Sequence, residues 1–199
     1  MPKWLRCFFQ RCMTNFTCKI EGKASEVGAV YEFACKYYES VIEREMALAN
    51  ITENDHILCI GGGVCPFSAI LFHQKTGAQV TVIDNNKDCI PKSKQVIERL
   101  GIDDHVHVRF QDGASAEVDL SAYSIIHTAL QVDPIDHVFS HIKSGAAPGA
   151  KILIRRPKKS LGSSYSELQN HLLKQCAYVS HKDCNIGTTF LYVKPKTGG

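Results

Sequence analysis

The sequence has no long apolar run: none of its hydrophobic stretches approaches the roughly 20 residues that a membrane-spanning helix needs. Its first residues, MPKWLRCFFQRCM, also lack an apolar centre long enough for a secretory signal peptide. We therefore expect a soluble, cytoplasmic protein without a membrane partner.

Basic residues are not gathered into one long block of the chain. The formal net charge is +3 over 199 residues, and lysine and arginine are interspersed with aspartate and glutamate. Domains that bind nucleic acid usually carry a clustered basic face. We therefore expect no nucleic-acid partner.

Paired cysteine motifs are missing too, although the chain has nine cysteines. No C-x-x-C pair occurs, so the sequence predicts neither a disulfide framework nor a four-thiolate zinc knuckle. The spacing of Cys7, Cys12 and Cys18 matches no common metal pattern, and the histidines show no H-E-x-x-H spacing. We predict no metal site and expect most of the cysteines to be buried.

The chain does have apolar segments in which strand and helix patterns alternate. Its 199 residues, 44% of them hydrophobic, suffice for one α/β domain. Runs of Val, Ile and Leu with little alternation, joined by helical stretches, predict a parallel sheet covered by helices on both faces. The expected strands are residues 56–60, 79–83, 106–110, 124–129 and 150–155, and the expected helices are residues 66–76, 87–100 and 134–144.

Both ends of the chain depart from this alternation. Residues 25–49 carry apolar side chains at helical spacing, which predicts one or two amphipathic helices before the sheet. After a helix expected at about 164–175, strand-like runs at 176–183 and 188–194 are separated only by the turn CNIG. So short a turn predicts an antiparallel hairpin, which would complete a mostly parallel sheet.

A run of three glycines follows the first expected strand, in HILCIGGGVCPFSAI. Glycine lets the backbone turn sharply into a helix whose first N–H groups can face a ligand. A dinucleotide motif needs a further glycine at the position of Pro66, and the phosphate-binding pattern G-x-x-x-x-G-K-[ST] is absent. Pyrophosphate binding is therefore disfavoured, and a ligand with a carboxylate near the helix start fits as well.

Acidic residues follow the second and third expected strands. Asp84, with Asn85 beside it, lies about 20 residues beyond the glycines, where a carboxylate can accept both hydroxyl protons of a ribose. The same residues also suit a helix N-cap. Asp112 and Gly113, in FQDGAS, are candidates to meet an adenine ring, or they form a simple turn. Together these positions favour a ligand that contains adenosine.

With the glycine turn, the two acids and the closing hairpin in this order, residues 51–193 resemble a class I S-adenosylmethionine-dependent methyltransferase. More narrowly, ILCIGGGVCPFSAIL and GAQVTVIDNNKDCIPKSKQVIERLGI are similar to the nicotianamine synthase family, in which proline and an apolar helix start follow the three glycines. Ordinary methyltransferases place an acid two positions before the first glycine. Cys59 stands there in this chain, and nicotianamine synthase-like proteins also lack the acid.

The resemblance implies a doubly wound, Rossmann-like α/β domain with a mostly parallel seven-stranded sheet and a C-terminal antiparallel hairpin. This domain would span residues 51–199, with a helical extension over residues 1–50 packed on it. The implied cofactor is S-adenosyl-L-methionine. Its expected contacts are Ile60, Gly61, Gly62, Gly63, Pro66, Asp84, Asn85, Asp112 and Gly113.

Catalytic candidates come from two segments that such a fold would bring to the carboxyl end of the sheet. Tyr38 and Glu39 could bind and deprotonate an acceptor, although on an amphipathic helix such residues are usually packing and solvated surface. His127 could act there too, or be a hydrogen-bonded core histidine. Arg155 could hold an anionic substrate group, or be solvated charge at a strand end.

The expected function is methyl transfer from S-adenosylmethionine to a small molecule, by a monomer or a homodimer. One alternative is nicotianamine-type transfer of an aminocarboxypropyl group, which releases methylthioadenosine. A second alternative is a protein that binds the cofactor without catalysis. Methylation of nucleic-acid bases is disfavoured, because HTALQ stands where common base methyltransferases carry [DN]-P-P-[YF].

Overall fold

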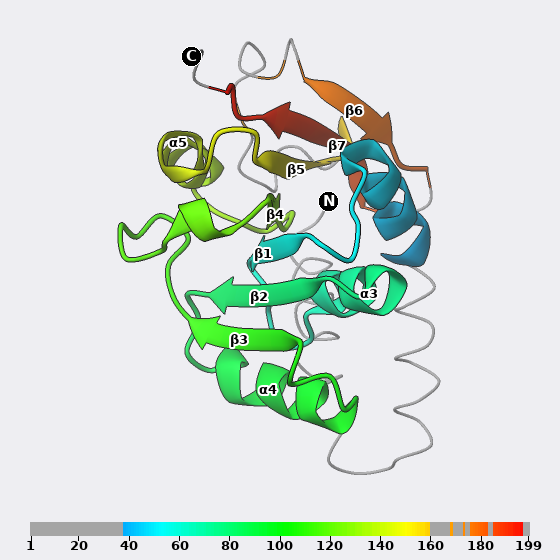
Figure 1. Ribbon diagram of the computed structural model, residues 1–199, viewed down its shortest axis with the longest axis vertical. Helices are drawn as coiled ribbons and strands as arrows, with labels where there is room; N and C mark the ends of the chain where they lie inside the picture. Colours follow the sequence, from blue (N-terminus) through cyan, green and yellow to red (C-terminus); the bar gives the residue numbers. More distant parts are fainter. Residues whose placement is uncertain (1–37, 160–167, 169–172, 174–175, 183–184, 197–199) are drawn as a thin grey trace.

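The computed structural model describes residues 38–159, 168, 173, 176–182 and 185–196. Most of the expected N-terminal extension, including its four cysteines, and nearly all of the helix expected at about 164–175 lie outside these residues. The described part is built around one seven-stranded sheet with the strand order β3-β2-β1-β4-β5-β7-β6 (Figure 1). The predicted fold class is therefore confirmed.

Five neighbouring strands of the sheet run parallel to one another. They are β1 (His56–Ile60), β2 (Gln79–Asp84), β3 (Val106–Phe110), β4 (Ile125–Thr128) and β5 (Lys151–Pro157). The strands β1, β2 and β4 are almost wholly buried, as expected for Val- and Ile-rich segments covered on both faces. The chain ends in the predicted antiparallel hairpin of β6 (Ala177–Ser180) and β7 (Ile186–Val193), in which β7 also pairs antiparallel with β5.

Helices connect the parallel strands and cover both faces. They are α3 (Phe67–Thr76), α4 (Cys89–Arg99), the short 3₁₀ helix η1 (Leu120–Ala122) and α5 (Ile135–Gly145), preceded by helical residues 38–49. The chain leaves α3 at Gly77, whose φ of 78° lies in the left-handed region and whose N–H donates to the carbonyl of His73. None of the described helices has the length and apolarity that a membrane span requires.

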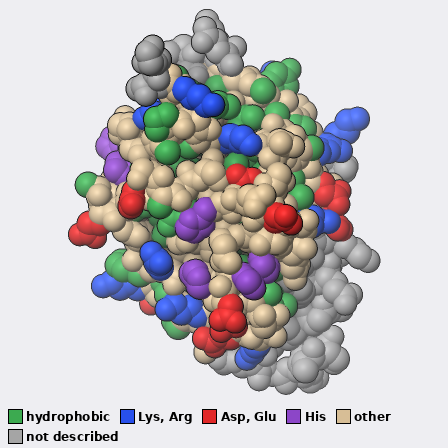
Figure 2. Space-filling model, viewed as in Figure 1, with side chains coloured by type: hydrophobic (Ala, Val, Ile, Leu, Met, Phe, Trp, Pro, Cys, Tyr) green, Lys and Arg blue, Asp and Glu red, His purple; other side chains and the backbone are tan. Residues whose placement is uncertain are grey.

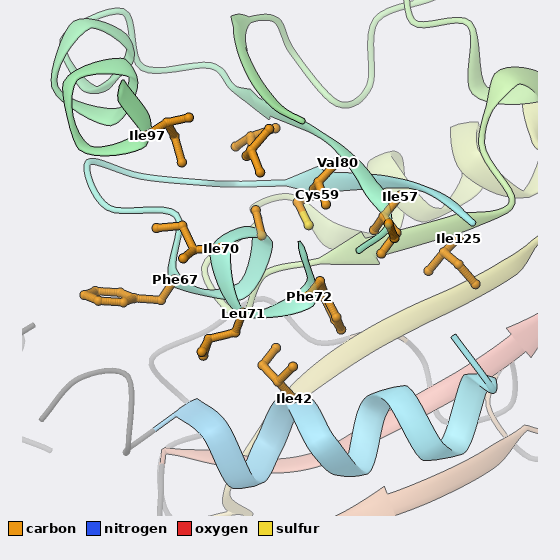
Figure 3. Packing of buried hydrophobic residues seen from close by; sticks show 14 of the residues in the cluster. Ile42, Ile57, Cys59, Phe67, Ile70, Leu71, Phe72, Val80, Ile97 and Ile125 are labelled. Atoms are coloured by element: carbon orange, nitrogen blue, oxygen red, sulfur yellow. The ribbon is translucent and has the colours of Figure 1, made fainter. Parts of the chain in front are cut away.

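Two apolar clusters fill the space on either side of the sheet. In one of them, Ile42 of the helix over residues 38–49 points toward Leu71 and Phe72 of α3 (Figure 3). The other cluster joins the opposite face of the sheet to α5, through residues such as Phe139 and Ile142. The helix over 38–49 therefore shares a core, and a face of the sheet, with α3.

Polar contacts also hold this helix to the strands. Arg44 donates from Nη1 to the carbonyl oxygen of Ser180 in β6 (2.8 Å), and Lys151 of β5 donates from Nζ to that of Ala49 (2.6 Å). Polar as well as apolar contacts therefore pack this helix on the rest of the described residues.

On the face shown in Figure 2, charged side chains of both signs are interspersed among the described residues.

The carboxyl ends of the parallel strands meet at one edge of the sheet. β1 lies between β2 and β4, so the chain proceeds from β1 to one side and later returns to the other. In open α/β sheets, ligands bind at the carboxyl edge beside such a reversal of strand order. The segments that follow β1, β2, β3 and β4 are therefore where a ligand site is expected.

Candidate active site

The first two glycines of the turn after β1 are closely packed. Gly61 has a φ of +85° and donates its N–H to the carbonyl oxygen of Ile83 in β2 (2.9 Å). A Cβ on Gly62 would lie only 2.2 Å from Cγ1 of Val82. The turn therefore lies directly on β2, and its backbone rather than side chains lines the edge of the sheet.

Asp84, at the end of β2, is tied to this turn. Its Oδ2 accepts the N–H of Gly63 at 2.7 Å, and its Oδ1 accepts the N–H of Asn86 at 2.8 Å. Each carboxylate oxygen can accept a second hydrogen bond, and the side chain is only half-buried. Asn85 is exposed beside it. Asp84 can therefore accept ligand hydroxyl groups while it holds the turn in place.

The helix that follows the glycines begins without a side-chain cap. Pro66 occupies the N-cap position of α3, makes no capping hydrogen bond, and is followed by no acidic residue in the first turn. The first N–H groups of a helix have no partner within the helix and favour negative charge. The start of α3 therefore suits an anionic group such as a carboxylate.

The loop after β3 lies beside the same edge. Gln111 donates its N–H to the carbonyl oxygen of Asp84 (3.0 Å), and Asp112 Oδ1 accepts the N–H two residues later (2.9 Å). A Cβ on Gly113 would lie 2.6 Å from Cγ2 of Ile60, so this backbone packs closely against the end of β1. Ile60 itself is buried in the core. Asp112 thus forms the local turn and remains exposed at the edge.

The two catalytic candidates on the helix over 38–49 contact different residues of α3. Tyr38 stacks on Phe67, the first residue of α3, with ring centroids 5.7 Å apart. Glu39 instead forms an ion pair with Lys75 in the last turn of α3 (2.7 Å), which Glu43 shares (2.9 Å). Tyr38 therefore lies at the start of the helix that follows the glycine turn, and Glu39 is engaged with Lys75.

His127 is buried in the middle of the sheet. Its side chain is 1% exposed, and its ring packs edge-on against Phe72, with centroids 5.4 Å apart. Burial, reinforced by the nearby charge of Arg155, lowers its pKa from 6.5 to about 3. His127 is therefore neutral at physiological pH, as a core histidine would be.

Arg155 is also buried, where it forms a two-pronged ion pair. Its Nε and Nη2 donate to the two carboxylate oxygens of Glu45, both at 2.7 Å, and its Nη1 donates to Oγ of Ser68 at 2.8 Å. Thr189 of β7 donates its hydroxyl to Glu45 Oε1 at 2.7 Å. The guanidinium therefore faces an internal carboxylate.

Sequence reasoning missed Glu45, although a signal for it exists. Val41, Ile42, Glu45 and Ala49 follow helical spacing, and all four are buried. A carboxylate on the apolar stripe of an amphipathic helix requires a buried partner. Only the fold shows that the partner is Arg155, 110 residues later in the chain.

Cys59 lies near this ion pair, on the same face of the sheet as His127, its register partner in β4. Burial raises the pKa of its thiol to about 12. The thiol is therefore protonated at neutral pH and is not a nucleophile. A cavity of about 310 Å³ lies elsewhere, between α4 and β3, and includes none of the predicted site residues.

Comparison with solved structures establishes the fold. A mutant of MtNAS in complex with S-adenosylmethionine matches with a TM-score of 0.81 and 20% identity, over 97% of this chain and 76% of the other. An RNA methyltransferase from Salinibacter ruber, in complex with S-adenosyl-L-homocysteine, matches with a TM-score of 0.60 and 17% identity, over 80% and 94%. A geranyl diphosphate C-methyltransferase from Streptomyces coelicolor matches with a TM-score of 0.57 and 15% identity, over 71% and 64%.

A family model also matches the chain. Its description is protein-L-isoaspartate(D-aspartate) O-methyltransferase (PCMT), and it covers residues 38–152. These residues extend from the helix over 38–49 to the first residues of β5, so they include the glycine turn and Asp84 but not β7. No curated protein matches the sequence.

Proposed function

Since the chain belongs to the protein-L-isoaspartate(D-aspartate) O-methyltransferase (PCMT) family, and is thus an S-adenosylmethionine-dependent transferase, we propose that it transfers a methyl group to a small molecule. The observation that carries the proposal is the 2.7 Å hydrogen bond from the Gly63 N–H to Asp84. It joins the backbone turn and the acid that the cofactor needs into one unit. The family match ends within β5, so it leaves the acceptor open.

The donors and acceptors at the edge of the sheet fit S-adenosylmethionine. Asp84 would accept the ribose hydroxyl protons, the exposed Asp112 would accept the amino group of the adenine, and the uncapped start of α3 would face the methionine carboxylate. The glycines keep side chains out of this space. When bound, the cofactor supplies a methyl group on a positively charged sulfur.

We place the acceptor beside Tyr38, at the carboxyl ends of β1 and β4. Tyr38 packs near Val41, Ile186 and Leu130, the last of which lies two residues beyond the end of β4. This apolar group excludes water, and its aromatic member can orient an acceptor for in-line attack. The chain therefore contributes chiefly orientation and desolvation. The buried His127 and the paired Glu39 are weaker candidates for a base, because one has a pKa of about 3 and the other is bound to Lys75.

Aminocarboxypropyl transfer is the second candidate. It is favoured by the likeness to MtNAS, a nicotianamine synthase, which extends over 97% of this chain. In this reaction an amine would attack the γ-carbon of the methionine portion, the C–S bond would break, and methylthioadenosine would leave with the electron pair. Cys59, in place of the acid of ordinary methyltransferases, supports the same alternative.

The deciding experiment identifies the nucleoside and the labelled product. The purified protein is incubated with S-adenosylmethionine labelled in its methyl group and with cell extract divided into small-molecule, RNA and protein fractions. Mass spectrometry then identifies the nucleoside product, with the Asp84→Ala variant as the background control. S-adenosylhomocysteine, with label in the small-molecule fraction alone, is the expected result.

Each other outcome overturns a defined part of the proposal. Label in RNA or protein overturns the small-molecule acceptor. Methylthioadenosine above the Asp84→Ala background establishes aminocarboxypropyl transfer instead. Binding of the cofactor by calorimetry, with no nucleoside product from any fraction, identifies a protein that binds the cofactor without catalysis.

A further inference from the structure

Beneath the proposed site lies a buried polar network that the proposed chemistry does not use. Glu45 and Thr189 are 0% exposed, Arg155 is 6% exposed and His181 is 5% exposed. Nε2 of His181 lies 2.9 Å from the Thr189 hydroxyl, which in turn donates to Glu45. Because that hydroxyl has one proton, its oxygen accepts from His181. The contacts therefore form a continuous path from His181 through Thr189 and Glu45 to Arg155.

Stability alone does not explain why the chain has this network. Two buried charges lose their hydration, and an ion pair in this setting contributes little more than an apolar pair of similar volume. Burial opposes ionisation of Glu45, but the adjacent guanidinium outweighs it and keeps the pKa of Glu45 below its ordinary value. Both groups are therefore charged, and each depends on the other. Such pairs serve better to fix one arrangement of the elements that carry them.

These elements all reach the carboxyl edge of the sheet. Ile154 pairs in register with Thr128, and Thr128 with Ile60, so Arg155 lies one residue beyond the level of Ile60, where the glycine turn begins. Arg155 contacts Glu45 on the helix over 38–49 and Ser68 in the first turn of α3. One guanidinium therefore connects β5 with the two helices that flank the glycine turn.

The start of α3 has no side-chain cap of its own to hold it. Pro66 provides no side-chain cap, and no acidic residue occupies the first turn. The Ser68 hydroxyl, held by Nη1 of Arg155, is a polar attachment of this turn to the rest of the domain. Tyr38, whose ring centroid lies 6.0 Å from the guanidinium carbon, stacks on Phe67 in the same turn.

We propose that Glu45 and Arg155 are positioning residues for the cofactor. Their two-pronged ion pair sets the orientation of the guanidinium, and its remaining nitrogen fixes Ser68 and the first N–H groups of α3 in the geometry that the cofactor requires. This inference rests on the proposed function and deepens it. It also explains why the chain places Arg155 inside, facing Glu45, rather than toward the acceptor.

The sharpest variant is Ser68→Ala, which removes one contact of Arg155 and leaves its ion pair intact. We expect the Kd for S-adenosylmethionine, measured by calorimetry, to rise roughly threefold to tenfold. The midpoint of thermal unfolding should fall by no more than about 3 °C. Ser144→Ala is the matched control: it also removes a helical serine hydroxyl, in α5 and outside the network, and should change neither value.

Hydrogen–deuterium exchange separates positioning from general stability. In the ligand-free Ser68→Ala variant, amide exchange should accelerate in peptides that span residues 61–70 and stay unchanged in those from α5.

The variant Arg155→Lys retains the charge but lacks the planar fork, so its affinity for S-adenosylmethionine should fall by at least about tenfold. Thr189→Ser, which keeps the hydroxyl, should retain the affinity that Thr189→Val loses.

The outcomes are distinguishable from those of the proposed function. A wild-type protein that does not bind S-adenosylmethionine overturns both. Wild-type binding together with unchanged affinity and exchange in Ser68→Ala and Arg155→Lys overturns the positioning role alone. Faster amide exchange throughout the chain, with unchanged affinity for S-adenosylmethionine, assigns the network to stability only. This result also overturns the positioning role.

Discussion

Asp84 and Glu45 are two carboxylates held by hydrogen bonds of similar length, in opposite surroundings. Asp84 is half-buried and accepts backbone N–H groups, one of them from a residue two positions further on. Glu45 is fully buried and, among the described residues, accepts hydrogen bonds from side chains alone, those of Arg155 and Thr189. The first can still bind a ligand, whereas the second is committed to the protein. The charge of a residue therefore says little about its role until its partners are known.

The largest expected effect comes from breaking the buried pair. Glu45→Gln should lower the free energy of unfolding by about 3–5 kcal/mol, because Arg155 would keep its charge without a counter-ion. Urea denaturation measures the loss. Glu43→Gln, on the same helix but in the partly exposed pair with Lys75, should change the value by no more than about 1 kcal/mol.

A double variant completes this test. Replacing both partners with apolar residues, as in Glu45→Leu with Arg155→Met, removes the unpaired charge and should restore much of the lost stability. Equal stabilities of Glu45→Gln and Glu43→Gln would show that burial does not distinguish the two glutamates.

Asp84 should affect the binding of S-adenosylmethionine. Asp84→Ala removes the acceptor for the ribose hydroxyls, and the binding free energy of S-adenosylmethionine should weaken by about 1.5–3 kcal/mol. Isothermal titration calorimetry provides the measurement. Asp88→Ala is the control, since this nearby exposed aspartate makes no capping hydrogen bond to α4. Equal affinity of the Asp84→Ala and wild-type proteins would refute the ribose contact.

The glycine turn offers a steric test of how the Asp84 site is built. In Gly62→Ala the new Cβ overlaps Val82, so unfolding free energy should fall by about 1–3 kcal/mol. Val82→Ala makes room for it, so the double variant should lose less than the sum of the two single losses in urea denaturation. Simple additivity would mean that the overlap is relieved by movement of the turn.

His127, which lies near Glu45, should make the stability of the fold depend on pH. Its pKa is about 3 in the folded protein and 6.5 as the ordinary value, so between these values the unfolded chain binds one more proton. Stability should therefore decrease as pH falls below about 6.5, by at most about 1.4 kcal/mol per pH unit. His127→Phe should flatten this slope in denaturation measured between about pH 7 and 5.

A second component of this profile belongs to Glu45. Its pKa is lowered on folding, so its contribution is present above the ordinary value of 4.5 and is lost as pH falls through the lower folded value. The His127→Phe protein should therefore keep its loss of stability at the acidic end. An unchanged slope between about pH 7 and 5 in that variant would assign the titration to other groups.

Local patterns predicted most of the fold. All eight strands and helices expected between residues 56 and 157 were placed within two residues of their observed ends. Runs of Val and Ile identify buried strands, and glycines or polar clusters interrupt them, so the signals lie within each segment. The hairpin was predicted for the same reason, although β6 is shorter than expected.

Different signals underlie the predicted site residues. The spacing of about 20 residues between the glycines and Asp84 follows from one strand–helix–strand unit, and the structure joins them by a hydrogen bond. The sequence suggested that Arg155 faces a substrate and that Glu39 is a catalytic candidate. In the structure Arg155 faces Glu45, which lies on the apolar stripe, while Glu39 binds Lys75. Helical spacing marks a buried position, but it does not identify a partner from another element.

The sequence by itself determined the alternation of strands and helices, the closing hairpin, the glycine turn and the acid that follows it. Each depends on residues close together in the chain, through backbone sterics and the burial of apolar faces. Only the tertiary structure decided that Arg155 pairs with Glu45 and that His127 remains neutral. These properties depend on charges and burial contributed by elements distant in sequence, since electrostatic interactions strengthen where packing excludes water.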